Sequence, residues 1–147
     1  MTHDMHTAGE PLRIVTSGFP TLTGSVLDKR KQMKEKFDHY RKFLINEPRG
    51  HKDMYGAILL QKDSRDNSFE VIFFHNEGYS TMCGHGVIAL GRYVVDAGLV
   101  KCNSPETQVN FHCPCGLVET YVNYDGSQVT GVRFHSVPAF VFVLGNF

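Results

Sequence analysis

Two groups able to transfer protons, a thiol and an imidazole, stand two positions apart in the segment Met82-Cys83-Gly84-His85-Gly86. Mostly apolar residues follow as far as position 97, which predicts that the segment opens a buried helix. The first turn of a helix has backbone N–H groups without partners and carries partial positive charge, so it binds a carboxylate well. Glycines at 84 and 86 let a ligand approach this backbone closely. The segment therefore predicts an anion site beside a thiol.

The same positive charge favours the thiolate form of Cys83. A dipole effect of up to about 2 kcal/mol corresponds to about 1.5 pKa units, which would lower the thiol pKa from about 8.5 to about 7. A thiol with that pKa both takes and gives a proton near neutral pH. The alternative is a small buried cysteine at a helix start, with glycines that serve only the turn. His85 has a similar alternative as a packed, hydrogen-bonded histidine, and its spacing from Cys83 is no evidence for a thiol-protease arrangement.

The remaining cysteines, Cys102, Cys113 and Cys115, raise the question of a metal site, because His112 precedes two of them. Structural zinc is usually held by four ligands from two paired segments, and here a second pair is missing. Pro114 separates two thiols in what reads as a strand, and residues two apart on a strand share a face. We therefore expect Cys113 and Cys115 to be small core side chains, and we expect no metal.

Composition bounds the remaining function classes. The 147 residues are 41% hydrophobic and 20% charged, which excludes intrinsic disorder and allows roughly 70% of the unfolded surface to be buried. Fifteen basic and fifteen acidic residues balance, so the chain lacks the one-signed field of a nucleic-acid or membrane-surface protein. The longest apolar run, 140–144, is far shorter than the ~20 residues of a membrane span. With no signal-peptide pattern, we expect a cytoplasmic protein with reduced thiols.

The pattern of elements predicts an α+β fold in one domain, residues 1–147. A surface helix should start at a capping box of Ser25 and Asp28, run to Leu44 with a solvated basic face, and end before Pro48. The second helix, 83–97, closes at Gly98 and is apolar on nearly every side, so a curved sheet must surround it. Asp125-Gly126 predicts a hairpin turn. Strands are expected at 12–16, 55–60, 69–75, 109–113, 117–124, 129–134 and 140–144.

Four segments in this order resemble the proline racemase family: 6–11 (HTAGEP), 47–56 (EPRGHKDMYG), 76–79 (NEGY) and 82–86 (MCGHG). The segments 113–116 (CPCG) and 134–138 (FHSVP) are most similar to the trans-3-hydroxy-L-proline dehydratases within that family. The resemblance implies a diaminopimelate epimerase-like fold of two similar halves, each a curved sheet around a central helix. It implies further that Cys83 is an acid/base thiol, that the amides of Gly84 and His85 hold the substrate carboxylate, and that no metal or organic cofactor is used.

Family members are considerably longer, so we expect this chain to represent the first half alone, with the second half absent and the isolated chain inactive. The expected reaction of a whole enzyme is dehydration of trans-3-hydroxy-L-proline to pyrroline-2-carboxylate. We expect a small molecule of proline or hydroxyproline type as substrate, and neither nucleic acid nor membrane as a partner. One alternative is proline racemase or hydroxyproline 2-epimerase activity, which needs a second proton-transfer group across the substrate. Another is a non-catalytic fragment that associates as a homodimer through its uncovered face.

Overall fold

The computed structural model describes residues 1–63 and 67–139, which form seven strands and three helices. The strands are β1 (Thr2–Thr7), β2 (Glu10–Val15), β3 (Tyr55–Asp63), β4 (Ser68–His75), β5 (Glu106–Cys113), β6 (Gly116–Tyr124) and β7 (Val129–His135). The helices are α1 (Val26–Lys36), α2 (Asp38–Ile45) and α3 (Gly84–Asp96). The α+β class is confirmed.

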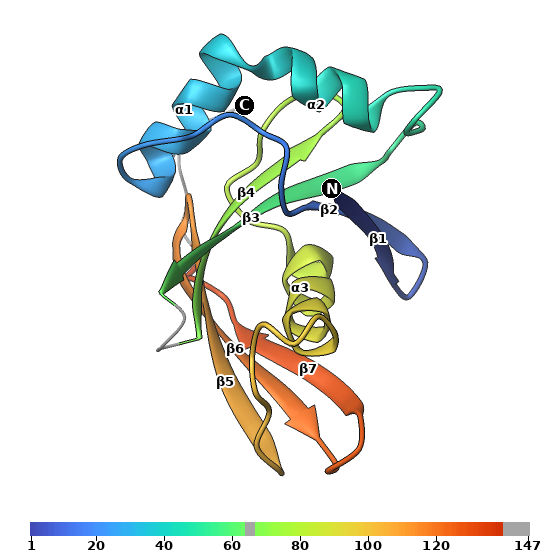
Figure 1. Ribbon diagram of the computed structural model, residues 1–147, viewed down its shortest axis with the longest axis vertical. Helices are drawn as coiled ribbons and strands as arrows, with labels where there is room; N and C mark the ends of the chain where they lie inside the picture. Colours follow the sequence, from blue (N-terminus) through green and yellow to red (C-terminus); the bar gives the residue numbers. More distant parts are fainter. Residues whose placement is uncertain (64–66, 140–147) are drawn as a thin grey trace, which may run out of the picture.

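All seven strands join one sheet in the order of the sequence. Neighbouring strands are antiparallel except for β2–β3 and β4–β5, which are parallel. These two parallel pairs are the places where helices connect the strands: α1 and α2 between β2 and β3, and α3 between β4 and β5. Figure 1 shows α1 and α2 on one side of β3 and β4, with α3 on the other side.

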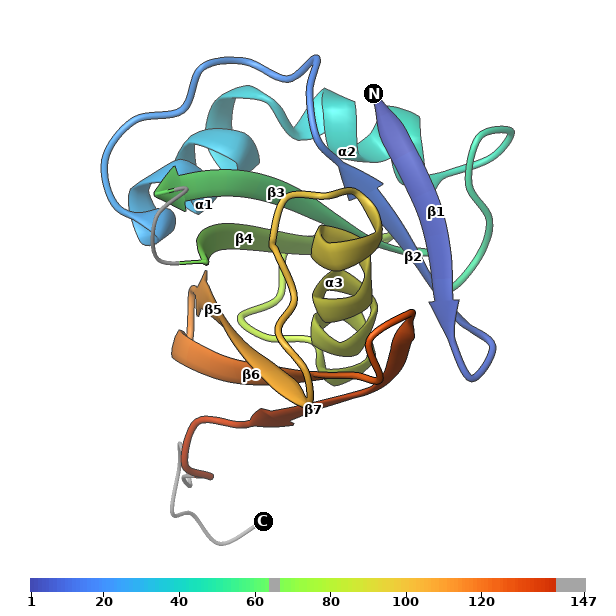
Figure 2. The same ribbon diagram turned by 60° about the horizontal axis from the view of Figure 1, so that its bottom comes forward.

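The curved sheet wraps around α3, as its apolar sequence predicted. Val87, Leu90 and Val94 have no exposed surface, and Figure 2 shows the helix enclosed by strands on several sides. Gly91 allows the closest approach, because a Cβ atom there would lie 2.8 Å from a methyl carbon of Val132 on β7. A mostly antiparallel sheet around a buried helix is therefore confirmed.

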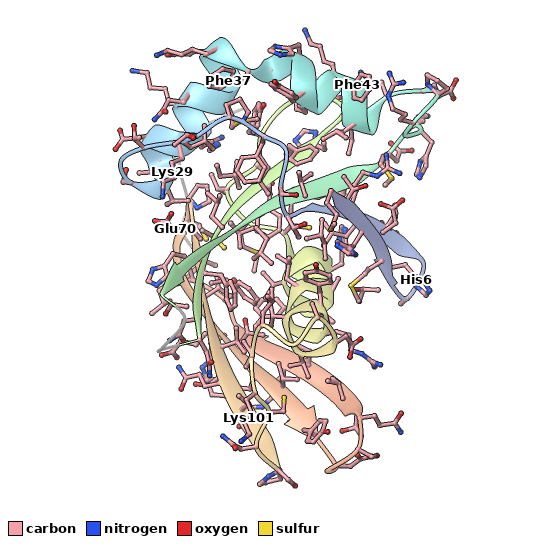
Figure 3. The ribbon with its side chains drawn as sticks, in the orientation of Figure 1. His6, Lys29, Phe37, Phe43, Glu70 and Lys101 are labelled. Carbon is pink, nitrogen blue, oxygen red and sulfur yellow. The ribbon has the colours of Figure 1, made fainter. Side chains whose placement is uncertain are left out.

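A second, smaller core lies under α1 and α2. Alternation along β4 creates both cores: Val71 and Phe73 face α3, whereas Ile72 and Phe74 face the outer helices. Lys29 of α1 also pairs with Glu70 of β4 at the rim of this second core, and the two side chains face each other in Figure 3. The sheet is thus covered on both faces where it carries α3.

The predicted surface helix starts correctly but is interrupted once. Both hydrogen bonds of the capping box are present, from the Asp28 amide to Ser25 Oγ (3.2 Å) and from the Ser25 amide to Asp28 Oδ2 (3.0 Å). At Phe37 the backbone turns to φ −126°, which ends α1 and lets α2 begin in a new direction. The single helix was therefore a wrong prediction. Apolar spacing continues smoothly across the break because both helices cover the same face of the sheet.

The strands differ from the predicted ones at the β1 edge of the sheet and at the β5–β6 turn. The edge strand β1 was missed because its polar residues lack alternation, and it forms by pairing with β2 through a tight turn at Ala8 and Gly9, both with positive φ. The expectation that Cys113, Pro114 and Cys115 lie on one strand is wrong, because Pro114 and Cys115 form the turn between β5 and β6. The predicted strand 140–144 lies outside the described residues.

Other local predictions hold. Asp125 Oδ1 accepts hydrogen bonds from the amides of Ser127 and Gln128 in the β6–β7 turn, and Gly98 has the positive φ that follows α3. Within residues 1–63 and 67–139, no helix is long and apolar enough to cross a membrane.

Candidate active site

Cys83 is the residue at which the chain enters α3. Its backbone is extended (φ −144°, ψ 112°), and its carbonyl accepts the first helical hydrogen bond, from Val87 N–H at 2.9 Å. The helix then begins at Gly84, so the predicted first turn of Gly84, His85 and Gly86 is confirmed. The side chain faces the core around α3, and the residue is 7% exposed.

His85 folds back toward the thiol. Its Nδ1 atom lies 3.4 Å and its Nε2 atom 3.7 Å from Cys83 Sγ, and Nε2 also lies 3.2 Å from the Pro11 carbonyl oxygen. A carbonyl oxygen only accepts hydrogen bonds, so in the neutral ring Nε2 carries the hydrogen and Nδ1 keeps a free lone pair. Nδ1 is therefore placed to accept the S–H hydrogen of Cys83.

The hairpin of β1 and β2 supplies the groups that orient His85. Thr7 Oγ1 donates to the His85 carbonyl oxygen at 2.9 Å, and Pro11 provides the acceptor for the ring. Both residues belong to the segment 6–11, but nothing in the sequence of that segment predicts that it lies near His85. The tertiary structure brings together motifs more than 70 residues apart in the chain.

Tyr55 is a residue of the site that reasoning from the sequence did not single out. It is the first residue of β3, and its ring meets the His85 ring edge-on with centroids 5.3 Å apart. Its hydroxyl contacts Ser80 Oγ. The only signal was its position within the segment 47–56, which also carried the resemblance.

Burial raises the pKa of the Cys83 thiol above its usual range, and the nearby Glu10 carboxylate adds to the rise. The nearby Gly86 amide and Tyr55 hydroxyl lower the pKa of the thiol but do not offset the loss of hydration. The expected value of about 7 is therefore wrong for this chain. The helix dipole is limited to about 2 kcal/mol, whereas desolvation shifts buried groups by several pKa units.

The two glycines beside the thiol have different roles. A Cβ atom on Gly86 would lie 2.9 Å from the Phe73 ring and 3.1 Å from Cys83 Sγ, so Gly86 is required by packing. A Cβ atom on Gly84 would make only ordinary contact, 3.4 Å from the Phe134 ring. Of the two positions, only half-buried Gly84 suits the close approach of a ligand.

The other thiols near the site contribute to packing. Cys113 is 2% exposed, and burial strongly raises the pKa of its thiol. Cys115 packs against the same core from the turn, and its amide donates to the Thr81 carbonyl oxygen at 3.2 Å. This bond ties the β5–β6 turn to the segment that enters α3. In the part of the chain that the structure describes, no group of three or more histidine, cysteine or acidic side chains is arranged to hold a metal.

Of two cavities compared with this region, only one adjoins it. A polar hollow of about 290 Å³ is lined by Asp53, Tyr55, His75 and their neighbours, and it adjoins the site through Tyr55. Cys83 is not among its lining residues. A larger apolar cavity, of about 440 Å³, lies between α1, α2 and the sheet and is lined by core residues such as Met33 and Phe74. Cys83 is not among its lining residues either.

Comparison with known proteins identifies this arrangement. The chain is 58% identical over 139 residues to the trans-L-3-hydroxyproline dehydratase of Saccoglossus kowalevskii and 49% identical over 141 residues to the 3-hydroxyproline 2-epimerase of Burkholderia multivorans. These matches cover 94% and 95% of this chain but only 43% and 42% of the relatives. The chain thus spans about two fifths of their length.

The fold agrees with these relatives. The crystal structure of a hydroxyproline epimerase from Agrobacterium vitis, with bound trans-4-hydroxy-L-proline, superimposes with a TM-score of 0.87 at 26% identity, over 97% of this chain and 43% of that one. The architecture is therefore the proline racemase and diaminopimelate epimerase-like fold. A family description, "Proline racemase", matches residues 2–146. With this match, and with the sheet wrapped around a helix that begins directly after Cys83, the chain belongs to the proline racemase family.

Proposed function

We propose that this chain supplies the proton-transferring thiol and the carboxylate-binding amides of a trans-3-hydroxy-L-proline dehydratase that uses no metal or organic cofactor. The single observation that carries the proposal is the position of Cys83, directly before the free amides of α3 and 3.4 Å from His85 Nδ1. The amides of Gly84 and His85 are the groups that would bind the carboxylate. Residues 1–147 would form the first of the two halves between which the substrate lies.

The proposed chemistry uses the first turn of α3 to stabilise charge. Hydrogen bonds from the Gly84 and His85 amides to the substrate carboxylate hold the negative charge that develops when the α-proton leaves. His85 Nδ1 accepts the thiol proton, and the Cys83 thiolate then removes the α-proton. The electrons of that C–H bond form a double bond between the α-carbon and C3. The C3 hydroxyl takes the proton held by His85 and leaves as water, which gives 2,3-unsaturated pyrroline-2-carboxylate. Transfer of the N–H proton to C3 then gives the cyclic imino acid.

The dehydratase is favoured because relatives at 54–58% identity carry that name. A second candidate is 2-epimerisation of hydroxyproline, since relatives named epimerases match the same residues at lower identity. Epimerisation returns a proton to the opposite face and so requires a second acid/base group. The two reactions give different products, a cyclic imino acid and a diastereomer, and one product assay separates them.

A chimaera tests the proposal. This chain would replace the matching residues of the Saccoglossus kowalevskii dehydratase, and the purified protein would be incubated with trans-3-hydroxy-L-proline. We expect pyrroline-2-carboxylate as product, and a loss of at least 1,000-fold in kcat on Cys83→Ser, the scale of losing an essential catalytic group. The matched control is Cys102→Ser, which changes a partly buried thiol outside the first turn of α3 and should leave turnover within twofold.

Three results would contradict the proposal: a folded chimaera with no turnover, turnover that survives Cys83→Ser, or formation of the 2-epimer alone. The chain by itself is expected to be inactive, because a charge pair in an open half-site is worth about 1 kcal/mol, compared with about 4 kcal/mol in a partly closed one. The four free thiols support a reducing compartment, and we propose the cytoplasm.

A further inference from the structure

We infer that Thr7 is a positioning residue for proton transfer between Cys83 and His85: its hydroxyl ties the first turn of α3 to the β1–β2 hairpin and keeps His85 Nδ1 directed at the sulfur. This inference rests on the proposed role of Cys83 as the base, which becomes a thiolate by giving its proton to His85. The segment 6–11 has no part in the proposed chemistry, and it thereby gains a role at the site.

Two hydrogen bonds join the hairpin to His85, one at the backbone and one at the ring. Thr7 Oγ1, at the end of β1, donates to the His85 carbonyl oxygen at 2.9 Å, and His85 Nε2 lies 3.2 Å from the Pro11 carbonyl oxygen on β2. A carbonyl oxygen has two lone pairs, so the Thr7 hydroxyl binds without displacing a helical N–H. The first bond holds the turn against the hairpin and so keeps the ring within reach of the second.

The hairpin is built as a rigid support for these two bonds. Thr7 and Pro11 belong to neighbouring register pairs of β1 and β2. The turn between them consists of Ala8 (φ 50°) and Gly9 (φ 97°), and the Gly9 amide donates to His6 Nδ1 at 3.3 Å. Figure 3 shows His6 at the tip of this hairpin. Because the turn fixes the separation of the two anchors, they hold the start of the helix at two points of one rigid unit.

The two anchors determine how the His85 ring meets the thiol. Nδ1 lies 3.4 Å from Cys83 Sγ while Nε2 faces Pro11, so the ring presents its free lone pair to the sulfur. Tyr55 also contacts the ring, edge-on with centroids 5.3 Å apart, but an aromatic contact of this kind does not select which nitrogen carries the hydrogen. Without the Thr7 hydroxyl, the turn is free to move away from the hairpin, and the bond to Pro11 weakens. The tautomer with its hydrogen on Nδ1 then becomes populated, and it cannot accept the thiol proton.

The test compares ¹⁵N-histidine-labelled 147-residue chains in which Thr7 is unchanged or replaced by valine or serine. Valine keeps the shape of threonine and removes the hydroxyl, whereas serine keeps the hydroxyl and removes a methyl group. In Thr7→Val, exchange of the His85 Nε2 hydrogen with water should become about fivefold faster, the effect of losing one hydrogen bond of typical strength, and a signal from the other tautomer should appear. In Thr7→Ser the rate should stay within twofold. Thr2→Val is the matched control, because it changes an exposed threonine at the other end of β1, and it should have no effect.

An unchanged exchange rate in folded Thr7→Val would overturn the inference. So would a larger rise in Thr7→Ser than in Thr7→Val, because a role in packing depends on the methyl group and not on the hydroxyl. If Thr7→Val does not fold, the pair Thr7→Ala and Thr7→Ser decides, since these two variants differ only in the hydroxyl oxygen.

The consequence for the reaction is measured separately, in the chimaera. There Thr7→Val should lower kcat about fivefold, and Thr7→Ser should leave it within twofold. An unchanged kcat in Thr7→Val would contradict the positioning role. A chimaera without turnover would count against the proposed function alone, because exchange of the His85 hydrogen is measured without any reaction.

Discussion

His85 Nδ1 lies 3.4 Å from Cys83 Sγ, in a ring whose other nitrogen faces a backbone carbonyl oxygen. That pairing determines which nitrogen of the neutral ring carries the hydrogen. The thiol thus meets a lone pair and not a second donor, which is the arrangement that a proton transfer from sulfur requires.

The first prediction concerns this tautomer. In ¹⁵N-labelled protein at pH 8, the His85 ring should show a protonated Nε2 and an unprotonated Nδ1 by long-range ¹H–¹⁵N correlation. On Cys83→Ala the tautomer should persist, because the carbonyl of Pro11 and not the thiol sets it. A hydrogen on Nδ1 in either protein would contradict the assignment.

The second prediction concerns the order of thiol labelling at pH 7. Because Cys83 is 7% exposed and burial raises its pKa, it should react more slowly than partly exposed Cys102 in the folded chain. This reverses the order expected from the helix dipole alone. Cys113 should be the slowest, since it is 2% exposed and its pKa is also raised. Cys83 as the fastest thiol in native protein, as judged by peptide mass mapping, would show that its thiolate is more stable than the burial implies.

The third prediction concerns the glycine beside the thiol. Gly86→Ala gains up to about 1 kcal/mol in helix propensity but places a Cβ atom 2.9 Å from Phe73, and overpacking typically costs 1–3 kcal/mol. We expect a net loss of about 1–2 kcal/mol in the free energy of unfolding, measured by urea denaturation. Gly84→Ala is the matched control and should be neutral or stabilising, because its Cβ atom meets only Phe134 at 3.4 Å. Equal effects of the two substitutions would contradict the packing role of Gly86.

The fourth prediction concerns the ion pair that anchors α2. Asp38 accepts two hydrogen bonds from Arg41, at 2.6 and 2.9 Å, and Arg41, which is 6% exposed, also donates to the carbonyl oxygens of His75 and Asn76. Asp38→Asn leaves this guanidinium without its counter-charge and should lower the free energy of unfolding by about 2–3 kcal/mol. In Asp96→Asn, which disrupts the exposed pair with Arg92, the loss should stay below about 1 kcal/mol.

The same pair predicts a pH dependence. The Arg41 guanidinium lowers the pKa of the Asp38 carboxyl in the folded state. The folded protein therefore binds this proton less tightly than the unfolded chain, and the stabilisation is present above the unfolded pKa of about 3.9. It is lost as pH falls through the lower folded pKa. Denaturation at pH 7 and pH 3 should show a smaller difference between Asp38→Asn and the unchanged chain at pH 3, and an equal difference at both would contradict the assignment.

Several features of this protein follow from its sequence by itself. The start of α3 after Cys83, the capping box of Ser25 and Asp28, and the turn at Asp125 each depend on residues within about four positions of one another. Their geometry is local, so the types and spacing of the residues suffice to predict it. The apolar sequence of α3 also predicts one feature of the tertiary structure, the enclosing sheet, because a helix without a polar face must be surrounded by other elements.

The environment of the thiol was decided only by the tertiary structure. Tyr55 and Pro11 reach His85 from other strands, and their positions depend on how the sheet curves around α3. For the same reason, the pKa of Cys83 is raised, whereas the helix dipole predicted that it would be lowered. The loss of hydration depends on every element packed around the sulfur. A helix dipole can be anticipated from a few consecutive residues, whereas desolvation is a property of the whole fold.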